Sequence, residues 1–179
     1  MNRRFVITGG PGGGKSTLLD ALAERGYRIA PEAARRLIKK RLAEGLASRP
    51  DPVTFARAIL DSDRAQYRAA TDHDGTTFFD RGVLDALYML DLESALSRGE
   101  IAGLIQAFPY NGTVFLLPPW EAIYATDSER DQTFEESVTV FEGMKRWYSR
   151  WGYDTVEVPR ASVEARVSFI LDAIGCRSL

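Results

Sequence analysis

The sequence predicts an α/β fold, in which a mostly parallel β-sheet is covered by helices on both faces. Two observations lead to this prediction. Runs of apolar and β-prone residues alternate with helical patterns along the whole chain. The first of these runs leads directly into a glycine-rich loop and then into a helical pattern. No repeat, low-complexity tract or domain boundary interrupts the 179 residues, so we expect one domain over residues 1–179.

The glycine-rich loop connects residues 4–8, a short β-prone run, with residues 18–24, which have helical spacing. It meets the spacing G-x-x-x-x-G-K-[ST] of a phosphate-binding loop. Glycines let the backbone turn so that its N–H groups surround phosphate oxygens, and the helix N-terminus adds partial positive charge. A flexible linker would need neither the preceding strand nor the Lys-Ser-Thr that follows. The residues expected to bind ATP here are Gly10, Pro11, Gly12, Gly13, Gly14, Lys15, Ser16 and Thr17.

Two of these residues have individual roles. Lys15 would place a mobile charge on the β- and γ-phosphates, and the Ser16 hydroxyl would ligate Mg²⁺.

A second strand is predicted at residues 28–30, and Pro31 suits the first position of a helix over residues 31–42. Glu32 and Arg35 follow the carboxyl end of this strand, the edge that faces the ligand crevice in open α/β sheets. Their alternative roles are a carboxylate that complements the helix dipole and a solvated basic face.

A long helical pattern over residues 55–70 follows a loop at residues 45–52. Phe55, Ile59 and Leu60 share one face of it. Any of its later polar residues could approach a substrate, but we favour surface or packing roles for them: Asp61, Asp63, Arg64, Gln66 and Tyr67. His73, the only histidine, lies in a turn-like stretch and is interpreted as solvated and not as a general base.

Residues 76–80 predict a buried strand that ends in Asp80, before an apolar helix over residues 83–96. An aspartate at a strand end is typical of a Walker B element, in which it reaches the metal shell. Its alternative role is an N-cap of the helix that follows. Arg81 is expected to contact a phosphate or the substrate.

The second half of the chain continues the alternation of helices and strands. Helices are predicted at residues 99–107 and 133–151 and from Ser162 onward, with strands at residues 113–117 and 153–158.

Between the strand at 113–117 and the helix at 133–151, the polar stretch of residues 121–132 has the composition of a closing lid. From a lid, Arg130 would reach the transferring phosphoryl group; alternatively it pairs with Asp131 or Glu135.

Composition excludes several classes of protein. Lys and Arg number 23 against 25 Asp and Glu, and a net charge of −2 argues against broad nucleic-acid binding. A single cysteine, Cys176, allows no intrachain disulfide and fits a reducing cytosol. There is no segment long and apolar enough for a membrane span and no signal-peptide pattern, so we expect a cytoplasmic protein.

On these residues the chain resembles the small P-loop NTPases of the AAA-type ATPase domain family, and among them the ribosylnicotinamide kinase and deoxynucleoside kinase-like proteins. The resemblance covers nearly the whole chain. The loop at residues 9–17 is specific for the superfamily. The segments at residues 31–35, 79–82 and 128–132 are more specific for this branch.

The resemblance implies a three-layer fold, with a five-stranded parallel sheet and the phosphate loop after a central strand. Glu32 matches an acid that acts as base or binds the acceptor, and Asp80 and Arg81 match a pair near the metal and phosphates. Arg130 matches a lid arginine, and the loop around Arg160 matches a region that packs on adenine.

This chain departs from the deoxynucleoside kinase pattern at two points. Those kinases usually carry a glutamate where Asp80 stands, and their lids often hold more than one arginine, whereas Arg130 is the only arginine between Trp120 and Phe134. Nor do we expect, within residues 1–179, the second region of ring-forming AAA machines.

The sequence thus favours an ATP-dependent phosphotransferase that acts on a small hydroxyl-bearing metabolite, with a nucleoside-like compound as one candidate. Catalysis would use Lys15, Glu32, Asp80, Arg81 and Arg130, with Mg²⁺ held by Ser16 and Asp80. Either Glu32 or Asp80 would orient the acceptor hydroxyl. The alternative is a regulatory or switch ATPase whose hydrolysis of ATP controls a protein partner.

Overall fold

A computed structural model describes residues 2–70, 75–124 and 133–176. Its five strands form one sheet in the order β2-β3-β1-β4-β5, and every neighbouring pair is parallel. β1 lies at the centre, as the resemblance implies for the strand before the glycine loop. The strands are β1 (Arg4–Thr8), β2 (Arg28–Ala30), β3 (Thr77–Asp80), β4 (Thr113–Leu116) and β5 (Asp154–Glu157).

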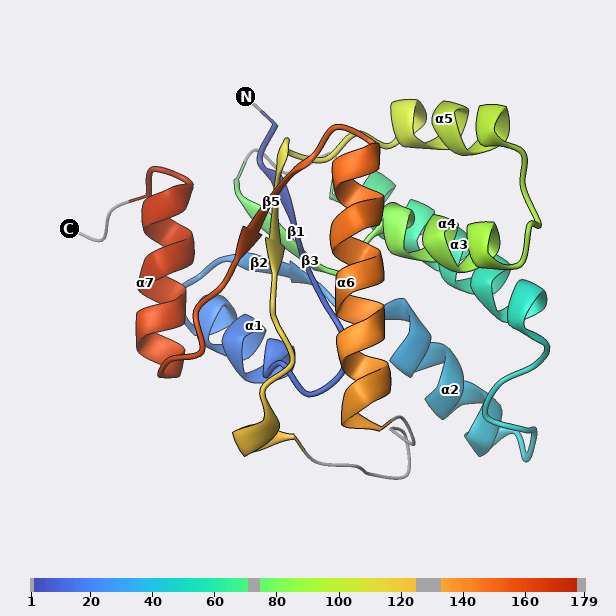
Figure 1. Ribbon diagram of the computed structural model, residues 1–179, viewed down its shortest axis with the longest axis horizontal. Coiled ribbons are helices and arrows are strands. Elements are labelled where there is room, and N and C mark those ends of the chain that lie inside the picture. Colours follow the sequence, from blue (N-terminus) through green and yellow to red (C-terminus); the bar gives the residue numbers. More distant parts are fainter. Residues whose placement is uncertain (1, 71–74, 125–132, 177–179) are drawn as a thin grey trace.

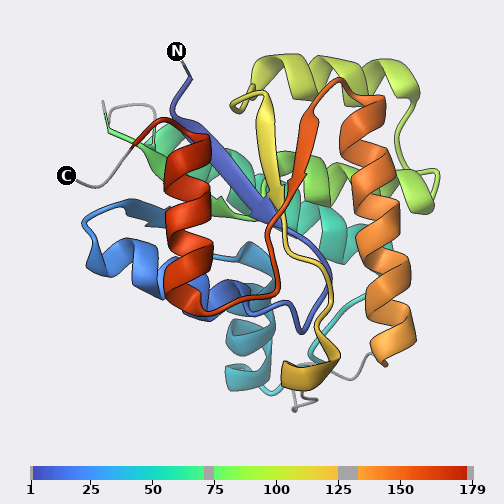
Figure 2. The ribbon, with the colours of Figure 1, turned by 60° about the vertical axis from the view of Figure 1, so that its left-hand side comes forward.

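Helices cover both faces of the sheet and complete the predicted three layers (Figure 1). One face carries α1 (Lys15–Glu24) and α7 (Val163–Ala173), which pack against each other (Figure 2). The other face carries the larger helical layer, which consists of α2 (Ala33–Ala43), α3 (Pro52–Ala69), α4 (Val83–Leu92), α5 (Arg98–Ala107) and α6 (Phe134–Arg150).

The two cores follow from the alternation of side chains along the strands. In the sheet register Val6 pairs with both Phe79 and Val114, and all three side chains enter the core beneath α2–α6. Their neighbours Phe78 and Phe115 point to the opposite core, beneath α1 and α7. Because both faces are buried, the three central strands β1, β3 and β4 contain consecutive apolar residues.

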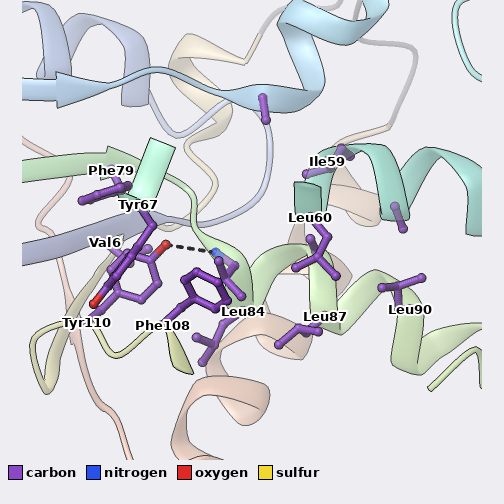
Figure 3. Packing of buried hydrophobic residues seen from close by; sticks show 14 of the residues in the cluster. Val6, Ile59, Leu60, Tyr67, Phe79, Leu84, Leu87, Leu90, Phe108 and Tyr110 are labelled. Carbon is purple, nitrogen blue, oxygen red and sulfur yellow. Dashed lines mark hydrogen bonds between the residues drawn. The ribbon is translucent and has the colours of Figure 1, made fainter. Parts of the chain in front are cut away.

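Aromatic side chains fill the larger core where α3, α4 and the start of β4 meet. Tyr110 packs edge to face against Tyr67 and Phe79, with ring centroids 5.2 and 5.1 Å apart, and the rings of Tyr67 and Phe79 are tilted at 6.3 Å. The Tyr110 hydroxyl accepts a hydrogen bond of 3.2 Å from the backbone N–H of Val83, at the first residue of α4 (Figure 3). The core thereby fixes the start of the helix that follows β3.

The predicted boundaries differ from the structure at several helices. α3 begins at Pro52, three residues before its predicted start, because Asp51 caps it through the backbone N–H of Thr54. Pro31 does not begin α2, because Glu32 has the non-helical backbone of an N-cap and the helix starts at Ala33. α4 ends at Leu92 and not at residue 96, since Ser94 adopts a left-handed backbone with φ of 51°. The apolar pattern continues past this turn because Ala95 and Leu96 still pack on the core.

The glycine loop lies between β1 and α1, at the carboxyl edge of the sheet. Gly14 is the N-cap of α1 and has a left-handed backbone. Gly9 has φ of 132°, and a Cβ at this position would lie 2.4 Å from the carbonyl oxygen of Leu117. Glycine is therefore required here by close packing between the ends of β1 and β4 as well as by phosphate binding.

Within the described part of the chain, no helix combines the length and apolar character that crossing a membrane requires.

The close approach at Gly9 generates a stability prediction. We expect Gly9→Ala to lower the free energy of unfolding by about 1–3 kcal/mol, because the added Cβ collides with backbone. The matched control is Gly103→Ala on the exposed side of α5, where a Cβ meets no atom within 4 Å. This control should raise stability by roughly 0.5–1 kcal/mol. Urea unfolding followed by circular dichroism measures both changes, and equal effects of the two variants would contradict the packing argument.

Candidate active site

A cleft of about 870 Å³ opens at the carboxyl edge of the sheet. This is the edge at which open α/β folds bind their ligands. One part of the cleft is lined by residues 11–17 of the glycine loop and by the first turn of α7, and we call it the phosphate half. The other part extends between α2, α3, α4 and α6, and we call it the acceptor half.

Lys15 is held inside the phosphate half. It is only 9% exposed, and its Nζ donates hydrogen bonds to the carbonyl oxygens of Gly9 at 3.3 Å and Gly10 at 3.0 Å. Burial, and after it the positive charge of Arg81, lowers the pKa of Lys15 from 10.5 to about 8. The ammonium group is thus short of negative partners until an anion enters the loop.

Arg81 lies between two carboxylates at the junction of the two halves. Its Nε donates to Glu32 Oε1 at 3.2 Å, and its Nη1 lies 3.7 Å from Asp85 Oδ1. The Arg81 backbone is left-handed, with φ of 65°, and occupies the turn between β3 and α4. Such a backbone is unusual for a residue other than glycine and costs free energy that the surrounding contacts must offset.

Glu32 follows β2 and is held in the same cluster. Burial alone would raise the pKa of Glu32, but the positive charges of Arg81 and Lys15 outweigh it and lower that pKa. Arg35 adds a weaker contact, with its Nε 3.9 Å from Glu32 Oε2. Glu32 is therefore an ionised carboxylate at neutral pH.

Asp80, the last residue of β3, lines the cleft beside Lys15. It is 8% exposed, and its buried Oδ1 has no hydrogen-bond partner among the described residues. Burial raises the pKa of Asp80 to about 6, although the positive charge of Lys15 opposes this shift. α4 is capped by Gly82 and not by Asp80, so the N-cap alternative for Asp80 is wrong.

These residues fit a magnesium ion. Mg²⁺ in nucleotide sites is bound by one or two protein oxygens together with water and phosphate. Ser16 presents an exposed hydroxyl at the start of α1, and Asp80 presents an unpartnered carboxylate oxygen, and both line the same cleft.

The other predicted site residues are placed as follows. Residues 11–17 line the cleft, whereas Gly10 contributes its carbonyl to Lys15 and packs against the backbone of Ser137. Arg160 is exposed and lies outside the lining of the cleft, where its Nε donates to the Pro119 carbonyl at 3.0 Å. Arg130 lies outside the described residues.

The sequence analysis missed Asp85, which positions Arg81. Asp85 is buried and accepts hydrogen bonds from the Thr8 hydroxyl, from the Gly82 N–H at 3.0 Å and from the Tyr148 hydroxyl at 2.6 Å. These groups come from β1, the start of α4 and α6. An acid inside the otherwise apolar pattern of α4 was the signal that could have identified it.

The sequence analysis also missed Arg166, in the first turns of α7. Its side chain is 4% exposed and lines the phosphate half. Its Nη1 donates to the Gly13 carbonyl at 3.1 Å, and its guanidinium lies 5.9 Å from the centre of the Trp120 ring. Arg166 thus supports the glycine loop from the side of α7.

The acceptor half is predominantly apolar. Its walls include Phe55 and Ile59 from α3, Met89 and Leu92 from α4, and Val140 and Met144 from α6. Arg35 and Arg49 also line it, together with one buried acid of α3, Asp63. Of the two roles left open for Asp63, its position in the lining of the cleft favours an approach to a substrate over a surface role.

The glycine loop, the strand-end aspartate and the parallel sheet define a P-loop NTPase. A family model described as an AAA domain matches residues 4–166. The chain therefore belongs to this AAA domain family, as the resemblance in the sequence indicates. No curated protein matches the chain by sequence.

Solved structures of kinases share the fold. The deoxyadenosine kinase from M. mycoides with bound dATP is 15% identical, with a TM-score of 0.65, and the match covers 97% of this chain and 99% of that one. The thymidylate kinase from Candida albicans is 13% identical, with a TM-score of 0.65, over 97% of this chain and 91% of that one. The arrangement of strands and helices is thus that of nucleoside and nucleotide kinases.

The lowered pKa of Lys15 generates a prediction about nucleotide binding. Phosphate oxygens favour the charged ammonium, so the dissociation constant of ATP should rise as the pH increases above about 8, where free Lys15 loses its proton. We expect a rise of about tenfold between pH 8 and pH 9.5, measured by titration calorimetry. Lys15→Arg, which stays charged, should show a flat profile over this range. A wild-type profile equally flat would contradict the assignment.

Proposed function

We propose that the chain is a Mg²⁺·ATP-dependent phosphotransferase that acts on a small hydroxyl-bearing metabolite of nucleoside-like shape, in one kinase-like domain over residues 1–179. The observation that carries this proposal is the shape of the cleft. It continues from the phosphate-binding loop into a second, mostly apolar half, and Glu32 and Arg81 stand where the two halves meet. A site that only hydrolysed ATP would need no such second half.

The proposed roles follow from charge and position. Lys15 stabilises the charge that develops on the transferring phosphoryl group, and Arg81 does so from the acceptor side. Ser16 and Asp80 hold Mg²⁺, which neutralises phosphate charge when it is bound. Arg130 would add a lid arginine to the phosphoryl group. The loop around Arg160 would pack near the adenine.

Glu32 is our choice for the group that orients the acceptor hydroxyl. Its carboxylate is ionised and stands beside Arg81 at the opening of the acceptor half. Asp80, by contrast, carries an unpartnered oxygen beside Lys15 in the phosphate half, which suits a metal ligand better than a base.

The kinase folds among the solved structures favour the same reaction. The deoxyadenosine kinase from M. mycoides holds dATP in one structure and the products dCMP and dCDP in another. A switch ATPase would hydrolyse ATP slowly without an acceptor and respond to a protein partner, and no feature of the cleft favours it over the kinase.

The first experiment measures ADP release with Mg²⁺ and ATP, alone and with a panel of nucleosides, nucleotide precursors and other small alcohols. The proposal predicts that at least one compound stimulates ADP release and gains a phosphate, which mass spectrometry detects. Slow hydrolysis that no compound stimulates would contradict the kinase.

With an accepted substrate, Lys15→Ala should lower kcat on the order of 10³-fold, because it removes a charge that the transition state needs. The matched control is Lys40→Ala on α2, whose side chain is exposed and contacts only Glu44 among the described pairs, at 3.9 Å. It should leave kcat within about twofold of wild type. Near-normal turnover by Lys15→Ala would exclude the proposed reaction at this site.

Two isosteric variants separate the roles of Glu32 and Asp80. Glu32→Gln should lower kcat on the order of 10²-fold with an unchanged Mg²⁺ requirement, because it removes the acceptor-orienting carboxylate. Asp80→Asn should instead raise the Mg²⁺ concentration needed for half-maximal activity at least about tenfold. Titration of activity against Mg²⁺ distinguishes them, and the reversed pattern would exchange the two roles.

A further inference from the structure

Asp63 is a buried acid that the cluster around Arg81 does not use. It lies on α3 and is 4% exposed, and its buried Oδ2 has no hydrogen-bond partner among the described residues. An unpartnered buried oxygen destabilises the folded protein. A ligand that forms a hydrogen bond with this oxygen would explain why a carboxyl group is buried here without a protein partner.

The helix directs Asp63 into the acceptor half. Phe55, Ile59 and Asp63 follow one another at intervals of four residues, so they share one face of α3. All three line the cleft, together with Met89 of α4 and Met144 of α6. Asp63 is therefore a polar group set among apolar walls, an arrangement that fixes the orientation of a bound ring.

The charges around Asp63 decide which form the carboxyl takes. Burial, supported by the negative charges of Asp85 on α4 and Glu32 before α2, raises the pKa of Asp63 well above 3.8. Arg81 after β3 and Arg36 on α2 oppose this shift but do not cancel it. In its protonated form the carboxyl offers a hydroxyl donor beside a carbonyl acceptor.

We propose that the Asp63 carboxyl is the specificity-determining group of the acceptor half and binds a planar acceptor through an amide edge, an N–H beside a C=O. The two groups then exchange a pair of hydrogen bonds, while Phe55, Ile59 and the two methionines cover the faces of the ring. This inference rests on the proposed phosphotransfer. Two sources offer such an edge, namely a lactam within a pyrimidine or purine base and a carboxamide attached to a ring.

The first test compares acceptors that differ only at this edge. Uridine and thymidine carry the lactam, and their N3-methyl derivatives lack the donor. A pyridine-carboxamide riboside and its N,N-dimethylamide form the second arm. We expect wild type to favour the intact member of one pair on the order of 10²-fold in kcat/KM, because the methylated member leaves a buried group unpaired. The arm in which the preference occurs identifies the source.

Variants of Asp63 assign this preference to the carboxyl. Asp63→Asn keeps a donor beside an acceptor and should retain the preference, whereas Asp63→Leu should reduce it to less than about threefold. Both should bind ATP as wild type does. Asp61→Leu on the exposed face of the same helix is the control, and it should keep the preference. Loss of the preference in Asp63→Asn as well as in Asp63→Leu would overturn the proposed pairing.

Failure of the inference and failure of the proposed function give different results. If wild type phosphorylates acceptors that lack an amide edge as well as those that carry one, the inference falls and the kinase stands. If no acceptor is phosphorylated, the proposed kinase function is contradicted. The role of Asp63 is then tested by calorimetric titration of the same ribosides in the presence of a non-hydrolysable ATP analogue. The inference is supported if the ribosides bind to wild type and Asp63→Asn but not to Asp63→Leu. It is overturned if binding is equal in all variants or absent from all of them.

A stability measurement tests whether Asp63 is structural instead. Removal of an unpartnered buried acid should leave the fold intact, so Asp63→Leu should unfold at a urea concentration equal to or above that of wild type. Asp61→Leu shows how far the urea midpoint shifts when an exposed aspartate of this helix is replaced by leucine. A midpoint for Asp63→Leu clearly below both would show that the carboxyl supports the fold, and would overturn the inference.

Discussion

The arrangement of the site depends on the partners of one largely buried guanidinium. Arg81 would be destabilising between β3 and α4 without nearby negative charge, and Glu32 and Asp85 supply it. Asp85 is itself held by Thr8 on β1 and Tyr148 on α6. The left-handed turn at Arg81 is tolerated because these contacts fix it. A single ion-pair cluster thus ties the ends of β1, β2 and β3 to α4 and α6.

In the phosphate half, two buried ionisable groups have shifted pKa values. Lys15 has a lowered pKa and Asp80 a raised one, and burial is the principal cause of both shifts. Each group is more easily neutralised in the free protein than in water. A bound phosphate would restore the charge of the lysine, and a bound cation would restore that of the aspartate. We therefore expect the binding of nucleotide and metal to be coupled to proton exchange by the burial that shapes the site.

Local sequence patterns predicted those parts of the molecule that depend on neighbours in the chain. The strand, glycine loop and helix at residues 4–24 are determined by backbone requirements, and Glu32 and Arg81 follow from their positions after strands. Asp85 and Arg166 were missed, and Asp63 was not separated from its polar neighbours, because each lies within a helix, where its role depends on the packing partner. Arg166 next to the buried Val167, and Asp63 in register with Phe55 and Ile59, were the available signals.

The two halves of the cleft are built from different kinds of elements. The phosphate half is formed at strand ends and helix starts, where backbone groups bind the ligand and few side chains matter. The acceptor half is formed by side chains of α2, α3, α4 and α6, which the fold positions but does not specify. Kinases only 13% to 15% identical to this chain can therefore share its fold while their named activities, deoxyadenosine kinase and thymidylate kinase, differ. We expect the specificity of this protein to reside on the faces of those helices, where Asp63 is the buried acid that α3 presents.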